Sequence, residues 1–197
     1  MMMSNKLKQT PSQTVGPFFS YALTPEQSGY NLKSIASPDM RADDTPGEHI
    51  NLSGKIYDGN GEIVSDAMIE IWQTDADGNY LDRDTPPMDG TFTGFGRCDC
   101  EIKKEFYFNT VKPGPIEEGH APHINMIVFM RGMLTHAYTR IYFSDESDAN
   151  EKDAVFKSVP TERRHTIIAN RVEEDNIVTY QFDLHMQGDN ETVFFDV

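Results

Sequence analysis

The chain contains the stretch Met68-Ile69-Glu70-Ile71-Trp72-Gln73, shortly ahead of the polar run Asp75-Ala76-Asp77-Gly78-Asn79. Alternating aliphatic and aromatic residues are typical of a strand, and Asp, Asn and Gly are typical of a tight turn. The sequence therefore predicts a strand at residues 68–73 and a polar turn that leads to Tyr80.

The residues before this strand predict its partner. Ile50, Leu52 and Ile56 mark an apolar face that begins after His49. The run Asp58-Gly59-Asn60-Gly61 supplies residues that tolerate positive φ in a turn. We therefore expect a hairpin, in which the strand at residues 68–73 returns beside the strand that precedes this turn.

Further strand patterns extend to the end of the chain, and one helix is predicted among them. Apolar residues recur at alternate positions in four segments, at residues 105–110, 124–130, 139–143 and 179–185. The helix is expected after Pro160, with Thr161 as its cap and an apolar stripe of Ile167, Ile168 and Val172. This pattern favours an all-β domain over residues 49–197, a two-sheet antiparallel β-sandwich with one short late helix.

Residues 1–48 are predicted to form an extended N-terminal arm. They are rich in Pro, Ser, Asn and Asp without sustained periodicity, apart from one expected helical turn around Leu32 to Ala36. Water would be a poor environment for the apolar side chains of such an arm, which include Val15, Phe18, Phe19 and Tyr21. We therefore expect the arm to pack on a partner subunit; packing on its own domain is the alternative.

The charge of the chain excludes several kinds of partner. Its 197 residues include 17 Lys and Arg against 32 Asp and Glu, a net charge of -15. Phosphate backbones and acidic membrane surfaces would be repelled, so nucleic acid and membranes are not expected as partners. With 38% hydrophobic residues the chain is lean in apolar content, which favours an oligomer that completes its surfaces.

Compartment is predicted from the apolar runs and the cysteines. No run approaches the roughly 18 apolar residues that a membrane span needs, and the first six residues lack the apolar core of a secretory signal. Cys98 and Cys100 lie two apart, with poor geometry for a mutual disulfide, so free thiols are expected. We expect a soluble cytoplasmic protein.

Three segments carry a family resemblance. The first is Thr10-Pro11-Ser12-Gln13-Thr14-Val15-Gly16-Pro17-Phe18. The second joins Gly54-Lys55-Ile56-Tyr57-Asp58-Gly59-Asn60-Gly61 to the stretch that ends at Tyr80. The third comprises Val111-Lys112-Pro113-Gly114-Pro115, Ala121-Pro122-His123-Ile124-Asn125 and Thr139-Arg140-Ile141-Tyr142-Phe143. In this order, and with the terminal Glu191-Thr192-Val193-Phe194-Phe195-Asp196, the chain resembles the intradiol ring-cleavage dioxygenases.

The resemblance implies a degenerate metal site. Iron-bearing members of the family hold a ferric ion with two tyrosinates and two histidines, hard anionic oxygens completed by imidazole. Tyr80 and His123 stand at the first tyrosine and first histidine positions, but Ile116 replaces the second tyrosine and Asn125 the second histidine. An Ile side chain has no lone pair and Asn offers only a neutral carbonyl, so we expect no metal on this chain.

The resemblance also implies a partner and a substrate. The expected partner is a homologous β subunit that binds the Fe(III), in an α/β hetero-oligomer. The expected reaction belongs to aromatic catabolism, the β-ketoadipate pathway. In it O2 cleaves the small aromatic substrate protocatechuate (3,4-dihydroxybenzoate) between its hydroxyls, which gives 3-carboxy-cis,cis-muconate.

Four residues of this chain are expected to line the substrate pocket. The resemblance assigns substrate-binding positions to Thr14, Gly16 and Pro17 in the arm and to Arg131, which is also the expected catalytic residue. A permanent guanidinium charge can offset the negative charge of a carboxylated catecholate. The alternative is that Arg131 forms an ordinary surface ion pair, which would contribute little.

Two other functions remain open. One is a catalytically silent β-sandwich that binds a protein or an aromatic ligand in a binding or regulatory role. The other is a self-sufficient intradiol dioxygenase that holds iron with altered ligands.

Overall fold

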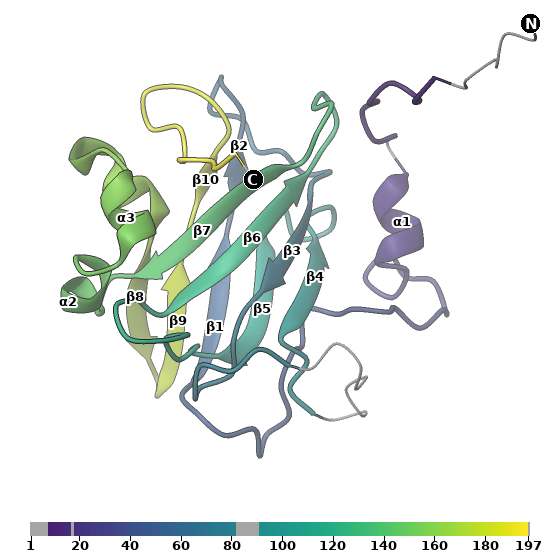
Figure 1. Ribbon diagram of the computed structural model, residues 1–197. Coiled ribbons are helices and arrows are strands. Elements are labelled where there is room, and N and C mark those ends of the chain that lie inside the picture. Colours follow the sequence, from purple (N-terminus) through teal and green to yellow (C-terminus); the bar gives the residue numbers. More distant parts are fainter. Residues whose placement is uncertain (1–7, 17, 82–90, 197) are drawn as a thin grey trace, which may run out of the picture.

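The computed structural model describes residues 8–16, 18–81 and 91–196, which form a mostly β structure with a few short helices (Figure 1). The strands of this part are β1 (His49–Gly54), β2 (Ile56–Tyr57), β3 (Met68–Trp72), β4 (Phe95–Asp99), β5 (Phe106–Val111), β6 (His123–Phe129), β7 (Ala137–Phe143), β8 (Ile168–Glu174), β9 (Ile177–Gln181) and β10 (Leu184–His185). The helices are α1 (Phe19–Leu23), α2 (Ser147–Asn150), α3 (Ala154–Ser158) and the 3-10 helix η1 (Thr161–Ile167). The β-rich class predicted from the sequence is confirmed.

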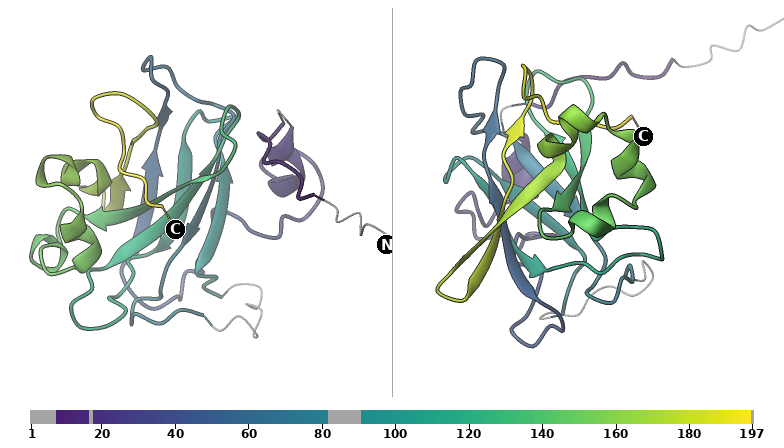
Figure 2. Two further views of the ribbon diagram at one scale, coloured as in Figure 1. Left: turned by 45° about the horizontal axis from the view of Figure 1, so that its top comes forward. Right: turned by 90° about the vertical axis from the view of Figure 1, so that its left-hand side faces the viewer.

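Eight of these strands follow one another in a nearly closed sheet. Their order is β4-β3-β6-β7-β8-β9-β1-β5, and β2 pairs separately with β10. The pairs β1–β9 and β7–β8 are parallel, so the prediction of a purely antiparallel arrangement is wrong, and the division into two sheets is not confirmed. A parallel pair needs a long crossover; between β7 and β8 it is made of α2, α3 and η1, at one side of the sheet (Figures 1 and 2).

The hairpin expected around residues 58–61 does not form as predicted. The turn itself exists, with the Gly61 N–H donating to the Asp58 carbonyl at 3.1 Å. However, β3 pairs with β4 and β6, whereas β1 pairs with β5 and β9. Turn residues are a local signal, but the partner of a strand is chosen by burial across the whole domain.

The late helix is also partly wrong. Thr161 begins the short 3-10 helix η1, which has no side-chain cap at its start. Ile168 and Val172, expected on a helical stripe, lie in β8, where Ile168 pairs with Tyr142 of β7. These β-branched side chains fit a pleated sheet at least as well as a helix, and the open position beside β7 determines the outcome.

Residues 37–40 occupy the gap between the two ends of the sheet. The Met40 N–H donates to the Asn109 carbonyl of β5 at 2.9 Å, and the Thr93 N–H donates to the Met40 carbonyl at 2.9 Å. On β4, the Arg97 N–H donates to the Ser37 carbonyl at 3.3 Å. Since the Met40 side chain is fully buried, this part of the predicted arm belongs to the core of its own domain.

The helix of the arm lies at Phe19–Leu23 and not near residues 32–36, where a turn was predicted. It packs beside β4 (Figures 1 and 2). The Thr24 hydroxyl donates to Asp99 at 2.8 Å, and the Tyr21 hydroxyl donates to Glu101 at 2.7 Å. For this stretch the alternative of packing on its own domain is what the structure shows.

Cys98 and Cys100 are buried as free thiols in and just after β4, as predicted. Burial raises the pKa of Cys98 to about 11, so its thiol is protonated at neutral pH. None of the helices in the described residues is long and apolar enough to cross a bilayer.

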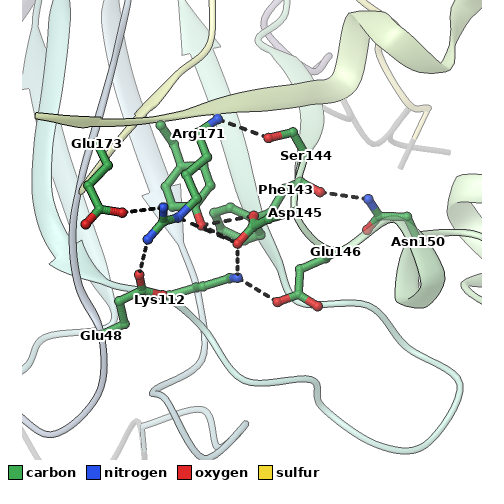
Figure 3. A network of polar contacts seen from close by, with 10 residues as sticks. Glu48, Lys112, Phe143, Ser144, Asp145, Glu146, Asn150, Arg171 and Glu173 are labelled. Atoms are coloured by element: carbon green, nitrogen blue, oxygen red, sulfur yellow. Dashed lines mark hydrogen bonds and ion pairs between the residues drawn. The ribbon is translucent and has the colours of Figure 1, made fainter.

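A polar network joins the end of β5 to the loop after β7 and to β8 (Figure 3). Lys112 binds Asp145 at 2.8 Å and Glu146 at 2.6 Å, and the Tyr180 hydroxyl donates to Asp145 at 3.0 Å. Burial disfavours the charged form of Lys112, but these two carboxylates outweigh it and raise its pKa. Arg171 also contacts Asp145, together with two further carboxylates, those of Glu48 and Glu173. The network fixes the crossover to the sheet where the parallel pair begins.

Candidate functional site

Two of the degenerate ligand positions meet on one face of the sheet. Tyr80 follows the polar turn after β3, and Asn125 lies in β6. The Asn125 Nδ2 donates to the Tyr80 hydroxyl at 3.3 Å. His123 lies two residues before Asn125, so both project from the same side of β6.

The third position, Ile116, belongs to a segment that packs against the turn before Tyr80. The Gly114 N–H donates to the Asp75 carbonyl at 2.8 Å. Gly78, at φ +87°, lies so close that a Cβ there would be 2.0 Å from the Pro115 carbonyl oxygen. Only glycine tolerates both constraints. The polar turn therefore holds Tyr80 near the segment of Ile116, whose hydrocarbon side chain is 40% exposed.

Arg140 is the residue that the sequence analysis missed. It pairs with Asn125 across β6 and β7, and its Nε donates to Asn125 Oδ1 at 3.3 Å. The register of the two strands brings a permanent cation to the group of residues that stand at the expected ligand positions. Arg140 was within a quoted motif, and its alternation with Tyr142 was the available signal.

His123 is a neutral imidazole in this setting. Its Nδ1 donates to the Ala121 carbonyl at 2.8 Å, which fixes the tautomer. Burial and then the charge of Arg140 lower the pKa of His123 to about 4. Burial raises the pKa of Tyr142, against the opposing effect of Arg140. At neutral pH these two groups are therefore uncharged.

The described residues do not fit a ferric ion. In residues 8–16, 18–81 and 91–196 no three His, Cys, Asp or Glu side chains come together as metal ligands. The donor set offers one neutral imidazole, one tyrosine hydrogen-bonded to a carboxamide, and a hydrocarbon at Ile116. A guanidinium bound to Asn125 adds positive charge where a trivalent cation would need anionic oxygen.

A cavity of about 300 Å³ lies beside this group. Phe95, Trp72 and Asn125 are cross-strand partners that line it, as are Glu70, Ile127 and Tyr138 in the next row. Arg140, the cross-strand partner of Asn125, lies behind this lining. Tyr80 and Leu81 complete the wall. The Trp72 ring meets Tyr80 and Phe95 edge to face, at centroid distances of 6.4 and 6.1 Å.

Arg131 and Thr14 come together at a separate place, after the end of β6. The Gly132 N–H donates to the Thr14 hydroxyl oxygen at 2.9 Å. Gly132 has φ +89°, a conformation that glycine adopts without strain. The structure thus places Thr14 against Gly132, the residue after Arg131. That Thr14 and Arg131 line one substrate pocket stays a prediction.

Arg131 itself is paired in the isolated chain. Its Nε donates to the Asp66 carboxylate, and its side chain is 57% exposed. This contact uses one of the five guanidinium N–H donors. Gly16 is exposed and has nothing within 4 Å of where a Cβ would be, and Pro17 lies outside the described residues.

A family model described as Dioxygenase matches residues 16–188. The protocatechuate 3,4-dioxygenase alpha chain of Burkholderia cepacia is 51% identical over 195 residues, covering 97% of this chain and 98% of its own length. The chain belongs to the intradiol dioxygenase family. A second alpha chain, from Pseudomonas putida, is 42% identical to this intradiol dioxygenase chain, with coverage of 96% and 97%.

Two more distant relatives share less sequence with this chain. The protocatechuate 3,4-dioxygenase beta chain of Burkholderia cepacia is 29% identical, covering 74% of this chain and 67% of its own length. The solved dioxygenase domain of a carbohydrate-binding fusion protein from Streptomyces sp. SirexAA-E superposes with a TM-score of 0.60 at 21% identity, over 89% of this chain and 97% of that domain. The intradiol dioxygenase fold is therefore present, in an oxidoreductase chain that resembles alpha chains more than the beta chain.

Proposed function

We propose that this chain is the α subunit of a protocatechuate 3,4-dioxygenase, which shapes the substrate pocket while a homologous β subunit binds the iron. One observation carries the proposal. Over nearly its full length the chain resembles alpha chains, and Ile116 and Asn125 stand where the resemblance expects the second tyrosine and the second histidine.

The proposed reaction adds both atoms of O2 to 3,4-dihydroxybenzoate and breaks the ring bond between the two hydroxyl-bearing carbons, giving 3-carboxy-cis,cis-muconate. Ferric iron on the partner would supply the activation of the aromatic ring toward dioxygen. The residues of this chain would orient the substrate, exclude water and offset charge.

Arg131 is the residue best suited to offset charge. The substrate carries a carboxylate and gains further negative charge when its hydroxyls ionise. In a chain of net charge -15 a carboxylated substrate is repelled unless a local cation opposes the field. The Arg131 guanidinium can form charge-assisted hydrogen bonds with a carboxylate through donors that Asp66 does not use.

The arm would form the neighbouring wall. Thr14 is held against Gly132, and Gly16 would continue this wall toward the partner. The substrate-binding role of Pro17 stays a prediction from the resemblance. Residues 8–14 and 16 are exposed in the isolated chain, which suits a segment that becomes covered on assembly. The proposed organisation keeps residues 1–48 as the arm and 49–197 as the domain, although residues 37–40 already bond to the sheet.

The proposal is tested by oxygen uptake. The chain is purified alone, its homologous β chain is purified alone, and the two are coexpressed. Only the coexpressed assembly is expected to consume O2 with protocatechuate, one molecule per molecule of substrate. Full activity of the β chain by itself would remove the need for this subunit. An inactive but stable mixed complex would favour the catalytically silent binding module, and activity of this chain alone would favour the self-sufficient enzyme.

A further inference from the structure

The cavity beside Arg140 has walls that suit a flat ring. Trp72 and Tyr80 are 39% and 41% exposed, although both lie over the sheet. With Phe95, Ile127 and Tyr138 they present aromatic and aliphatic surface to one cavity of about 300 Å³. This volume is at the lower end of small-molecule pockets. Aromatic walls of this kind bind planar rings by stacking and edge contacts, so the cavity has room for a single-ring ligand.

The polar end of the cavity offers the ligand a hydrogen-bond donor, the Tyr80 hydroxyl. The Tyr80 oxygen accepts from Asn125 Nδ2 at 3.3 Å. A hydroxyl that accepts in this way still has its own proton to donate. Arg140 binds the other end of the same carboxamide at 3.3 Å and adds positive charge behind it. A ligand that matches this end carries an oxygen acceptor, and a negative charge on that oxygen strengthens the match.

The carboxylate in the cavity wall does not cancel this preference. Glu70 is bound by Arg97 through Nε at 2.8 Å and through Nη2 at 2.6 Å. Both side chains are 14% exposed, so the pair is well shielded and close to neutral as a unit. The positive charge of Arg140 is therefore the dominant one at the polar end.

We propose that this cavity is a second aromatic-binding site, which holds a single-ring phenol or aromatic carboxylate without turnover. The ring would lie against Trp72 and Phe95, with its oxygen acceptor toward the Tyr80 hydroxyl and the charge of Arg140 behind Asn125. No step of ring cleavage occurs there, because the described side chains do not fit the metal. The site is separate from Arg131 and Thr14, and it does not depend on the proposed function.

Trp72 makes the site measurable, because it is the one tryptophan of the chain. The full chain is titrated with 4-hydroxybenzoate, which has one ring, a carboxylate and a single hydroxyl, while tryptophan fluorescence is recorded. A saturable change is expected. Cyclohexanecarboxylate, with the same charge and no aromatic ring, is expected to bind at least tenfold more weakly. No saturable change, or tighter binding of trimethylphenylammonium than of 4-hydroxybenzoate, would overturn the proposal.

The variant Tyr80→Phe removes the donor and keeps the ring. It is expected to weaken binding about tenfold, the effect of losing one hydrogen bond to a charged acceptor. Tyr57→Phe is the matched control: Tyr57 is in β2, stacked on His185, and its variant should bind as the parent does. Equal affinity of Tyr80→Phe and the parent chain would contradict the assigned orientation.

Equilibrium dialysis of the coexpressed assembly tests whether the site stays open there. Two molecules of 4-hydroxybenzoate per α/β pair are expected, one at the partner's iron and one in this cavity. At a concentration that half-saturates the parent cavity, the cavity of Tyr80→Phe should hold about a tenth of a molecule per pair, against about half a molecule in the parent. One molecule per pair in the parent assembly would overturn the proposal for the assembled enzyme. If no assembly forms, the proposed function fails, while the titration of the single chain still decides the site.

Discussion

Replacing Arg131 with Ala should lower kcat/KM for protocatechuate by on the order of 100-fold in the coexpressed assembly. The expected loss corresponds to about 3 kcal/mol, the scale of a charge-assisted contact whose partner is left unpaired. Catechol lacks the carboxylate, so its kcat/KM should change by only a few-fold. Steady-state oxygen uptake with both substrates measures the difference.

Two further variants complete this experiment. Arg131→Lys keeps the charge but loses the fork of donors, so it should fall between the parent and Arg131→Ala. Arg163→Ala removes an arginine of similar exposure that pairs with Glu191, and its assembly should act on protocatechuate as the parent does. An equal loss with both substrates would show that Arg131 acts in assembly or folding. An unchanged kcat/KM would show that Arg131 forms only a surface ion pair with Asp66.

Replacing Asp153 with Ala should lower the free energy of unfolding by about 3–5 kcal/mol. Its fully buried carboxylate accepts from the Tyr142 hydroxyl at 3.0 Å and from the Ala121 N–H at 3.0 Å. The same carboxylate caps α3 through the N–H groups of Val155 and Phe156, at 2.8 and 3.0 Å. The substitution leaves buried donors without acceptors and removes the cap. Urea unfolding followed by circular dichroism measures the loss.

The matched control is Asp148→Ala in the first turn of α2, where the side chain is exposed. It should change the free energy of unfolding by less than about 0.5 kcal/mol. A similar small effect for Asp153→Ala would show that the carboxylate is not the link between α3 and the segment before β6.

The pH dependence of stability provides a second readout of Asp153. Burial alone would raise its pKa, but the four hydrogen bonds outweigh burial and hold the pKa below its usual value. A depressed pKa means that the folded state prefers the charged form. This contribution is complete above the ordinary pKa of an aspartate and is lost as the pH falls through the lowered one. The stability difference between the parent chain and Asp153→Ala should therefore narrow in acid.

Much of the strand content could be predicted because the side chains within each strand follow a recognisable alternating pattern. Strands β3, β5, β6 and β7 have aliphatic or aromatic side chains at alternate positions. β4 was missed because its sequence, Phe95-Gly96-Arg97-Cys98-Asp99, has few β-formers. It forms a strand since β3 and residues 37–40 supply partners on both sides. Strand pairing depends on contacts between distant segments, which a local pattern does not contain.

The candidate site, too, could be predicted only in part from the sequence. The order of the motifs identified Tyr80, Ile116, His123 and Asn125 as one group, and alternation placed two of them on one face of β6. The role of Arg140 required the register between β6 and β7, which only the structure supplies. The contact of Thr14 with Gly132 likewise joins residues 118 positions apart. The resemblance predicted that both segments line a pocket, but no residue pattern predicted this hydrogen bond.

The most direct test of the account is the iron content of this chain purified with and without its partner. Metal analysis together with electron paramagnetic resonance should find no tightly held ferric ion on the chain alone after dialysis. The same measurement on the coexpressed assembly should find one ferric ion per α/β pair, with the red-brown colour of iron bound to tyrosinate. One ferric ion held tightly by each molecule of this chain in the absence of any other polypeptide would contradict the account.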